Sequence, residues 1–130
     1  MTKKELAARL RADTETHYNC CQSMLVPFAG ECGLDRDIAF RLGAFFGSGM
    51  RIGSACGVLT GGLMVLGMAG AGEDKARQYR EAFRTEHGAV DCAVLLQRAA
   101  SGEGLTGKPF CDSMVLAAVE LLEQLLDTAH

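Results

Sequence analysis

The chain has 130 residues, which is enough for one domain to bury a hydrophobic core without disulfides or a structural metal. It carries 13 Lys and Arg against 16 Asp and Glu, so it lacks the excess positive charge that binding to a phosphate backbone requires, and nucleic acid is not an expected partner. Aromatic residues make up only 6%, whereas Gly, Ala, Leu and Met are common, which favours helices packed closely through small residues.

The predicted elements are all helices, because no segment shows the alternation of apolar and polar residues that is typical of strands. The predicted fold is an all-α single domain over residues 1–130, a bundle of six or seven helices around a Gly-rich central helix. Pro27 is expected to end or kink the second helix early. In chain order, the predicted helices span residues 3–15, 20–29, 35–46, 54–69, 73–86, 92–100 and 109–127.

The N-terminal segment MTKKELAARL has two lysines but no apolar run of signal-peptide length after them. A cleaved export signal is therefore not expected, and the expected location is the cytoplasm. In a reducing cytoplasm the six cysteines are not expected to form a disulfide framework. They are better interpreted as reactive thiols, metal ligands or buried apolar residues.

The predicted central helix lies in an uncharged run of 21 residues, 52–72, which is long enough to span a membrane. Seven of these residues are glycine, and Gly53, Gly57 and Gly61 stand four apart, forming a ridge that a neighbouring helix can approach closely. Because several amphipathic helices surround this run in the sequence, a soluble bundle with a buried central helix is favoured over a membrane span.

Four cysteines follow capping or first-turn residues at predicted helix starts, where free N–H groups and the helix dipole favour a thiolate. They are therefore predicted to have lowered pKa values. Cys21 points elsewhere on its helix and Cys32 lies in a turn, so both rank lower as site residues. The candidate site residues are Cys20, Cys56, Cys92 and Cys111.

Three hypotheses follow from these cysteines. The first is thiol redox chemistry, with Cys56 as one partner of a redox pair and Cys20, Cys92 or Cys111 as the other. The second is a binding module in which the same four thiolates hold zinc, copper or an iron–sulfur cluster; no Cys-x-x-Cys pair occurs, so the common metal modules are excluded. The third is a structural role for buried, inert thiols.

The segments YNCCQSML, GSACGVLTGGLMVLG, FRTEHGAVDC and KPFCDSMVLAAVELLEQLL together resemble the C_GCAxxG_C_C family of redox-active proteins of bacteria and archaea. The likeness covers nearly the whole chain. It implies that the four family cysteines are the same four identified by helix position. At the central motif, Val58 stands where the family has alanine, which is expected to narrow the space beside Cys56. Cys32 has no counterpart in the family pattern.

Three other residues near the cysteines have either a functional or a purely structural interpretation. His87 is near enough to Cys92 in sequence to join a Cys/His site, but capping a surface helix is favoured. Arg51 is a candidate to stabilise a thiolate or an anion near Cys56, with a surface loop arginine as the favoured alternative. Asp91 is predicted as a helix N-cap. The expected partner is a redox protein or a small thiol, and a homodimer is compatible with the apolar composition.

Overall fold

The computed structural model describes residues 1–127, and in this range the all-α fold class is confirmed. A short 3₁₀ helix, η1 (Gly30–Cys32), and a single π-type turn, η2 (Gly49–Gly53), accompany the α-helices. The only pairing of strand type between described residues is an isolated bridge between Ala55 and Asp91. The α-helices are α1 (Lys3–Ala12), α2 (Cys20–Ala29), α3 (Arg36–Leu42), α4 (Gly57–Met68), α5 (Glu73–His87), α6 (Cys92–Ser101) and α7 (Gly107–Asp127).

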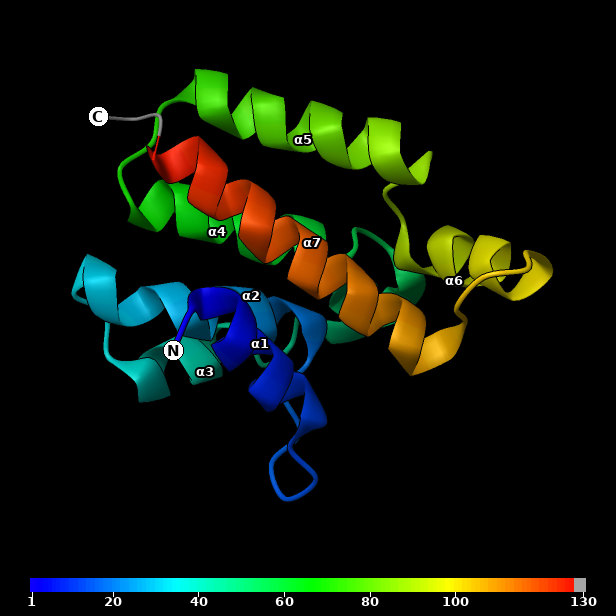
Figure 1. The fold of residues 1–130 in the computed structure, drawn as a ribbon, viewed down its shortest axis with the longest axis horizontal. Helices are drawn as coiled ribbons and strands as arrows, with labels where there is room; N and C mark the ends of the chain where they lie inside the picture. The colour runs from blue at the N-terminus through cyan, green and yellow to red at the C-terminus, as the bar shows by residue number, and fades with distance from the viewer. Residues whose placement is uncertain (128–130) are drawn as a thin grey trace.

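The predicted single central helix is replaced by a central pair, the Gly-rich helix α4 and helix α2, of which α2 is the more buried. Helix α4 packs most extensively against α2 and also against α5 and α7, while α1 covers α2 and α7 and α3 lies on α2. In Figure 1, α5 runs along the top, α4 and α7 cross below it, and α2 with α1 and α3 forms the lower part. Helices α2, α4 and α7 all begin at the right-hand end of this view, next to α6 (Figure 1). The starts of several helices therefore meet at one end of the molecule.

Glycines on α4 set the distance to its neighbours. A Cβ added at Gly61 would lie 2.8 Å from Met24 Cβ, and one added at Gly57 would lie 3.0 Å from the Cys21 nitrogen, so α2 approaches too closely for larger residues. Gly62 faces the ring of Tyr79 from α5, whose hydroxyl donates to the Val58 carbonyl at 2.6 Å. The predicted glycine ridge is confirmed for the two glycines that face α2.

The segment before α4 differs from the prediction. The helix begins at Gly57 rather than at residue 54, because residues 54–56 are not helical and form an antiparallel bridge with residues 90–92. Gly53, the third member of the predicted ridge, lies outside the helix with φ +71°. A left-handed turn with positive φ angles precedes this segment and comprises Ser48, Gly49, Met50 and Arg51. The left-handed conformation costs about 1–2 kcal/mol for each of these residues other than glycine.

Other boundaries shift for local reasons. Helix α1 ends at Ala12 because the Asp13 side chain accepts N–H groups from Glu15 and Thr16 and starts a turn. Helix α3 is shorter than predicted and ends at Leu42. Helix α2 has its predicted bounds, so the expectation that Pro27 ends it early is wrong.

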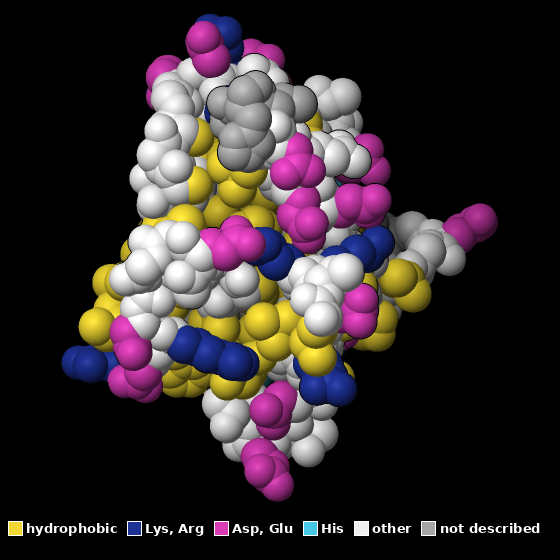
Figure 2. All heavy atoms as spheres, turned by 60° about the vertical axis from the view of Figure 1, so that its left-hand side comes forward, with side chains coloured by type: hydrophobic (Ala, Val, Ile, Leu, Met, Phe, Trp, Pro, Cys, Tyr) yellow, Lys and Arg dark blue, Asp and Glu magenta, His cyan; other side chains and the backbone are white. Residues whose placement is uncertain are grey.

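The visible surface in Figure 2 carries Lys and Arg side chains interspersed with Asp and Glu, rather than one continuous basic area. Ile38, Leu42 and Phe45 form an exposed apolar row, with 45%, 53% and 72% of their surfaces accessible. Between residues 1 and 127, no helix is both long enough and apolar enough to cross a membrane. The homodimer stays a prediction.

Candidate functional site

Cys20 is the first residue of α2 and is held there by a reciprocal capping box. Asn19 Oδ1 accepts the N–H of Gln22 at 2.8 Å, and Gln22 Oε1 accepts the N–H of Asn19 at 2.8 Å. Asn19 Nδ2 also donates to the carbonyl of Gly43 at 2.9 Å, and both amide side chains are buried. The predicted position of Cys20 is confirmed, and these hydrogen bonds fix it relative to the end of α3.

Cys111 lies on α7, the long helix that crosses α4. Because α7 begins at Gly107 rather than at residue 109, Cys111 is in the second helical turn. The prediction that it lies in the first turn is wrong. The free N–H groups of a helix start belong to its first four residues, so another interaction must stabilise a thiolate here.

The thiols of Cys20 and Cys111 interact directly between α2 and α7. The Cys20 thiol donates a hydrogen bond to the Cys111 sulfur, which raises the pKa of Cys20 far above its ordinary value; burial adds to this. The pKa of Cys111 is lowered to about 7, first by this interaction with Cys20 and then by the positive charges of Arg11 and Lys108, while burial and the Asp112 carboxylate oppose the shift. Cys111 is therefore the cysteine that ionises near neutral pH, with Cys20 as its proton-bearing neighbour.

Arg11 on α1 ties the two cysteine-bearing segments together, although the sequence analysis did not single it out. Its Nε donates to Asp112 Oδ1 at 2.6 Å, and its Nη1 donates to the carbonyl of Tyr18 at 2.9 Å. Asp112 follows Cys111, and Tyr18 lies two residues before Cys20. The residue is 8% exposed, so its charge acts on the thiols with little screening by water.

Cys56 and Cys92 flank the isolated bridge between Ala55 and Asp91. The N–H of Cys56 donates to the Val90 carbonyl at 2.8 Å, and the N–H of Cys92 donates to the Ser54 carbonyl at 2.7 Å. The two cysteines therefore lie on the same face of the paired segments, diagonal to each other. A Cβ added at nearby Gly49 would lie 2.8 Å from Cys92 Cβ, so the left-handed turn packs directly against this pairing.

The N–H groups at the start of α4 lower the pKa of Cys56 as predicted, but a larger opposing effect determines the direction of its shift. Cys56 is the N-cap of α4, and the N–H groups of Val58 and Leu59 favour its thiolate. Burial outweighs them and raises the pKa of Cys56 to about 11. Burial likewise raises the pKa of Cys92. The prediction of lowered pKa values is wrong for these two thiols, since burial disfavours a thiolate by more free energy than the helix start provides. It is also wrong for Cys20, whose pKa is raised first by its interaction with Cys111 and then by burial.

The four predicted cysteines are close enough to affect one another's ionisation. Cys56 interacts electrostatically with Cys20, Cys92 and Cys111, and Cys92 interacts with Cys111. They gather at the end where α2, α4 and α6 begin and α7 passes (Figure 1). Every cysteine is present as a free thiol.

The two cysteines that ranked lower have different surroundings. Cys21 is fully buried, its sulfur is 3.8 Å from the Met64 sulfur, and burial raises its pKa to about 11. Cys32 lies in η1 beside Glu31, and burial also raises its pKa. Cys32 is thus apart from the cluster, whereas Cys21 lies beneath it.

No metal-binding geometry is preformed in residues 1–127, where no group of three or more His, Cys, Asp or Glu side chains is placed to hold an ion. Zinc, copper or cluster ligation by the four cysteines stays a prediction.

His87, Arg51 and Asp91 take mostly structural positions. His87 lies in the last turn of α5, with its ring 4.7 Å from that of Phe83. Arg51 donates to the Ala44 carbonyl at 3.2 Å and lies over the ring of Phe45. Asp91 occupies the N-cap position of α6, but its side chain makes no capping hydrogen bond.

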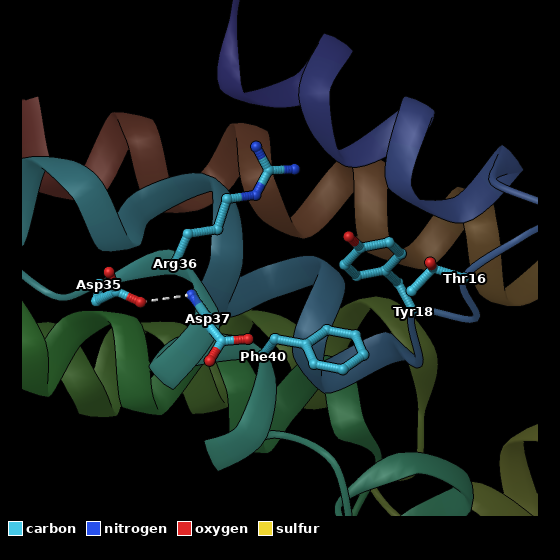
Figure 3. Close-up of a pocket in the computed structure, with 6 residues that line it drawn as sticks. All are labelled: Thr16, Tyr18, Asp35, Arg36, Asp37 and Phe40. Carbon is cyan, nitrogen blue, oxygen red and sulfur yellow. Dashed lines mark hydrogen bonds between the residues drawn. The ribbon is translucent and has the colours of Figure 1, made fainter.

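The larger pockets in residues 1–127 have none of the clustered cysteines in their linings, although one of about 370 Å³ reaches Asn19, next to Cys20. One of about 460 Å³ is lined by six residues on the loop before α2 and on α3; Figure 3 shows the rings of Tyr18 and Phe40 meeting edge to face, with centroids 5.1 Å apart. Asp35 there accepts the Asp37 N–H and caps α3 rather than facing a ligand (Figure 3). A substrate would therefore meet the cysteines at the surface, where Cys92 and Cys111 are only partly buried.

Comparison with known proteins places the chain in a family. No curated protein and no solved structure matches the chain. A family model described as "Putative redox-active protein (C_GCAxxG_C_C)" matches residues 18–125, which include all four clustered cysteines and almost every helix. The chain therefore belongs to the C_GCAxxG_C_C family of redox-active proteins.

Proposed function

We propose that this protein is a dithiol redox protein of the cytoplasm, in which Cys111 is the attacking thiolate and Cys20 is the resolving thiol. The observation that carries the proposal is the buried guanidinium of Arg11, which donates to Asp112, next to Cys111, and to the carbonyl of Tyr18, two residues before Cys20, and so keeps the two cysteine-bearing segments together. The two thiols interact there and shift each other's pKa in opposite directions. An attacking cysteine must be ionised near neutral pH, and a resolving cysteine must keep its proton until the first step is complete. The opposite pKa shifts of the pair fit these two roles.

The reaction is reduction of a disulfide substrate by two electrons. The Cys111 thiolate attacks one sulfur of the substrate, a mixed disulfide forms, and the other substrate sulfur leaves with the electron pair and takes a proton from water. The Cys20 thiol then attacks the Cys111 sulfur, the mixed disulfide breaks, and the second substrate thiolate takes the proton that Cys20 loses. The products are two substrate thiols and a Cys20–Cys111 disulfide.

Arg11 is a positioning residue in this scheme. It holds Tyr18 and Asp112 by hydrogen bonds and so keeps the two cysteine-bearing segments together. Its charge also favours the thiolate that attacks and that later leaves.

Cys56 as a member of the first redox pair stays a prediction. Its burial and raised pKa do not suit it to attack a substrate from solvent.

Trapping the disulfide tests the proposal. Reduced protein is mixed at pH 7 with one equivalent of glutathione disulfide, quenched with acid after short times, alkylated, and mapped by mass spectrometry without reduction. We expect glutathione on Cys111 first and then a Cys20–Cys111 disulfide. Cys20→Ser should stall with glutathione on Cys111, Cys111→Ser should react slowly, and Cys32→Ser is the matched control. If Cys111 reacts no faster than Cys32, or if no Cys20–Cys111 disulfide forms, the proposal is wrong.

A further inference from the structure

Cys56, at the start of α4, is buried and lies close to the start of α2, where Cys20 is the first residue. The residue after it, Gly57, is so close to α2 that a Cβ added there would lie 3.2 Å from Cys20 Cβ. Cys56 is 6% exposed, and the sulfurs of Cys20 and Cys56 are near enough to influence each other's ionisation. Cys20 thus has two neighbouring thiols, Cys111 on α7 and Cys56 at the start of α4.

We propose that Cys56 is a second resolving thiol, which takes over the disulfide from Cys111 and leaves the oxidised protein with a buried Cys20–Cys56 disulfide and a free Cys111 thiolate. This inference rests on the proposed function, because it begins with the Cys20–Cys111 disulfide. It gives a role to the buried cysteine of the family motif that the first redox step does not use.

The transfer is a thiol–disulfide exchange that needs no further oxidant. Cys56 loses its proton to water and attacks the Cys20 sulfur, so a Cys20–Cys56 bond forms as the Cys20–Cys111 bond breaks. The electron pair leaves with Cys111 as its thiolate. One thiol is consumed and one is released, and the oxidation state of the protein does not change.

The surroundings of Cys111 favour this direction. A thiol of low pKa is the better leaving group, and a disulfide whose reduced form is stabilised is the stronger oxidant. The charges of Arg11 and Lys108 stabilise the Cys111 thiolate after it leaves, whereas burial disfavours a Cys56 thiolate. Both effects favour the Cys20–Cys56 disulfide over the Cys20–Cys111 disulfide at neutral pH.

The rate of exchange from the Cys20–Cys111 to the Cys20–Cys56 disulfide should depend on pH. Because the pKa of Cys56 is about 11, the fraction of its thiolate increases tenfold for each pH unit up to about pH 10. The conversion of the first disulfide into the second should accelerate tenfold per pH unit between pH 7 and pH 9.

Peptide mapping of the wild-type chain over time tests the inference without any substitution. After one equivalent of glutathione disulfide, the Cys20–Cys111 disulfide should appear first and then give way to Cys20–Cys56, while Cys111 regains fast reaction with a thiol reagent. A Cys20–Cys111 disulfide that persists alone, or conversion into any other pair, would falsify the role of Cys56 but leave the proposed function intact. Absence of the Cys20–Cys111 disulfide from the outset would instead overturn the proposed function.

Two variants sharpen the result. Cys56→Ser should halt at Cys20–Cys111 and keep Cys111 blocked after one equivalent, whereas Cys32→Ser should regain the fast thiol as the wild type does. If Cys56→Ser recovers the fast thiol at the wild-type rate, the inference is wrong. Should this buried substitution prevent folding, the wild-type time course and its pH dependence still decide the question.

Discussion

The thiol of Cys20, at the first position of α2, interacts with the thiol of Cys111, in the second turn of α7, and the interaction raises the pKa of Cys20 and lowers that of Cys111. Two residues that are distant in sequence thus form a pair in which one sulfur holds a proton and the other is ready to lose one.

Removing the hydrogen-bond donor should raise the pKa of Cys111. In Cys20→Ala the thiolate loses its strongest stabilising interaction, so alkylation of Cys111 by iodoacetamide at pH 7 should slow severalfold and its pH profile should move to higher pH. Cys20→Ser keeps a donor and should move less. Cys21→Ala, at the adjacent buried thiol, is the control. An unchanged profile in Cys20→Ala would contradict the assigned hydrogen bond.

Replacing Arg11 should have two separable effects. Arg11→Met removes a buried positive charge and leaves the Tyr18 carbonyl without its donor, so we expect a loss of about 1–3 kcal/mol in unfolding free energy. It should also shift the alkylation profile of Cys111 to higher pH, whereas Arg11→Lys, which keeps the charge, should restore most of the profile. Denaturation in urea and alkylation across pH measure the two effects. If both variants react at Cys111 like the wild type, Arg11 does not position the thiolate.

The buried thiols should make the protein less stable in alkali. Folding raises the pKa of Cys21 and Cys56 from 9.0 to about 11, so the stabilisation from their protonated forms is complete below pH 9 and is lost as pH rises towards 11. Each thiol should account for a loss of about 2 kcal/mol between pH 8 and pH 11. Urea denaturation of wild type and Cys21→Ala at both pH values checks this. The variant should lose about 2 kcal/mol less, and an equal loss in both proteins would refute the assignment.

Two glycines on the same helix should respond in opposite ways to alanine. A Cβ at Gly62 would overlap the ring of Tyr79, so Gly62→Ala should lower the unfolding free energy by about 1–3 kcal/mol. Gly67 has no neighbour within 4 Å of an added Cβ, so Gly67→Ala should stabilise the helix by up to about 1 kcal/mol. Thermal unfolding followed by circular dichroism compares them. Equal effects at the two positions would contradict the packing of α5 on α4.

The helices could be predicted well because their signals are local. Apolar periodicity, Asn19 before α2, and the charged sequence of α5 each act within a few residues, and the bounds of α2 match the prediction. The end of α1 moves because of a local turn at Asp13, whereas the start of α4 could not be predicted because a distant segment determines the backbone there. The start of α4 moves to Gly57 because the residues before it pair with the segment around Asp91, and no local pattern encodes that contact.

The sequence by itself determined that the protein is all-α, that α4 packs closely through its glycines, and which four cysteines to consider, because composition, glycine spacing and the family pattern are properties of the chain. Only the tertiary structure decided which thiol ionises. The helix dipole is a local effect and was foreseen, but burial, the Cys20 hydrogen bond and the charge of Arg11 come from α1, α2 and α7 meeting at one end of the bundle. A pKa depends on everything within a few ångströms of the sulfur, and that environment exists only once the helices have packed.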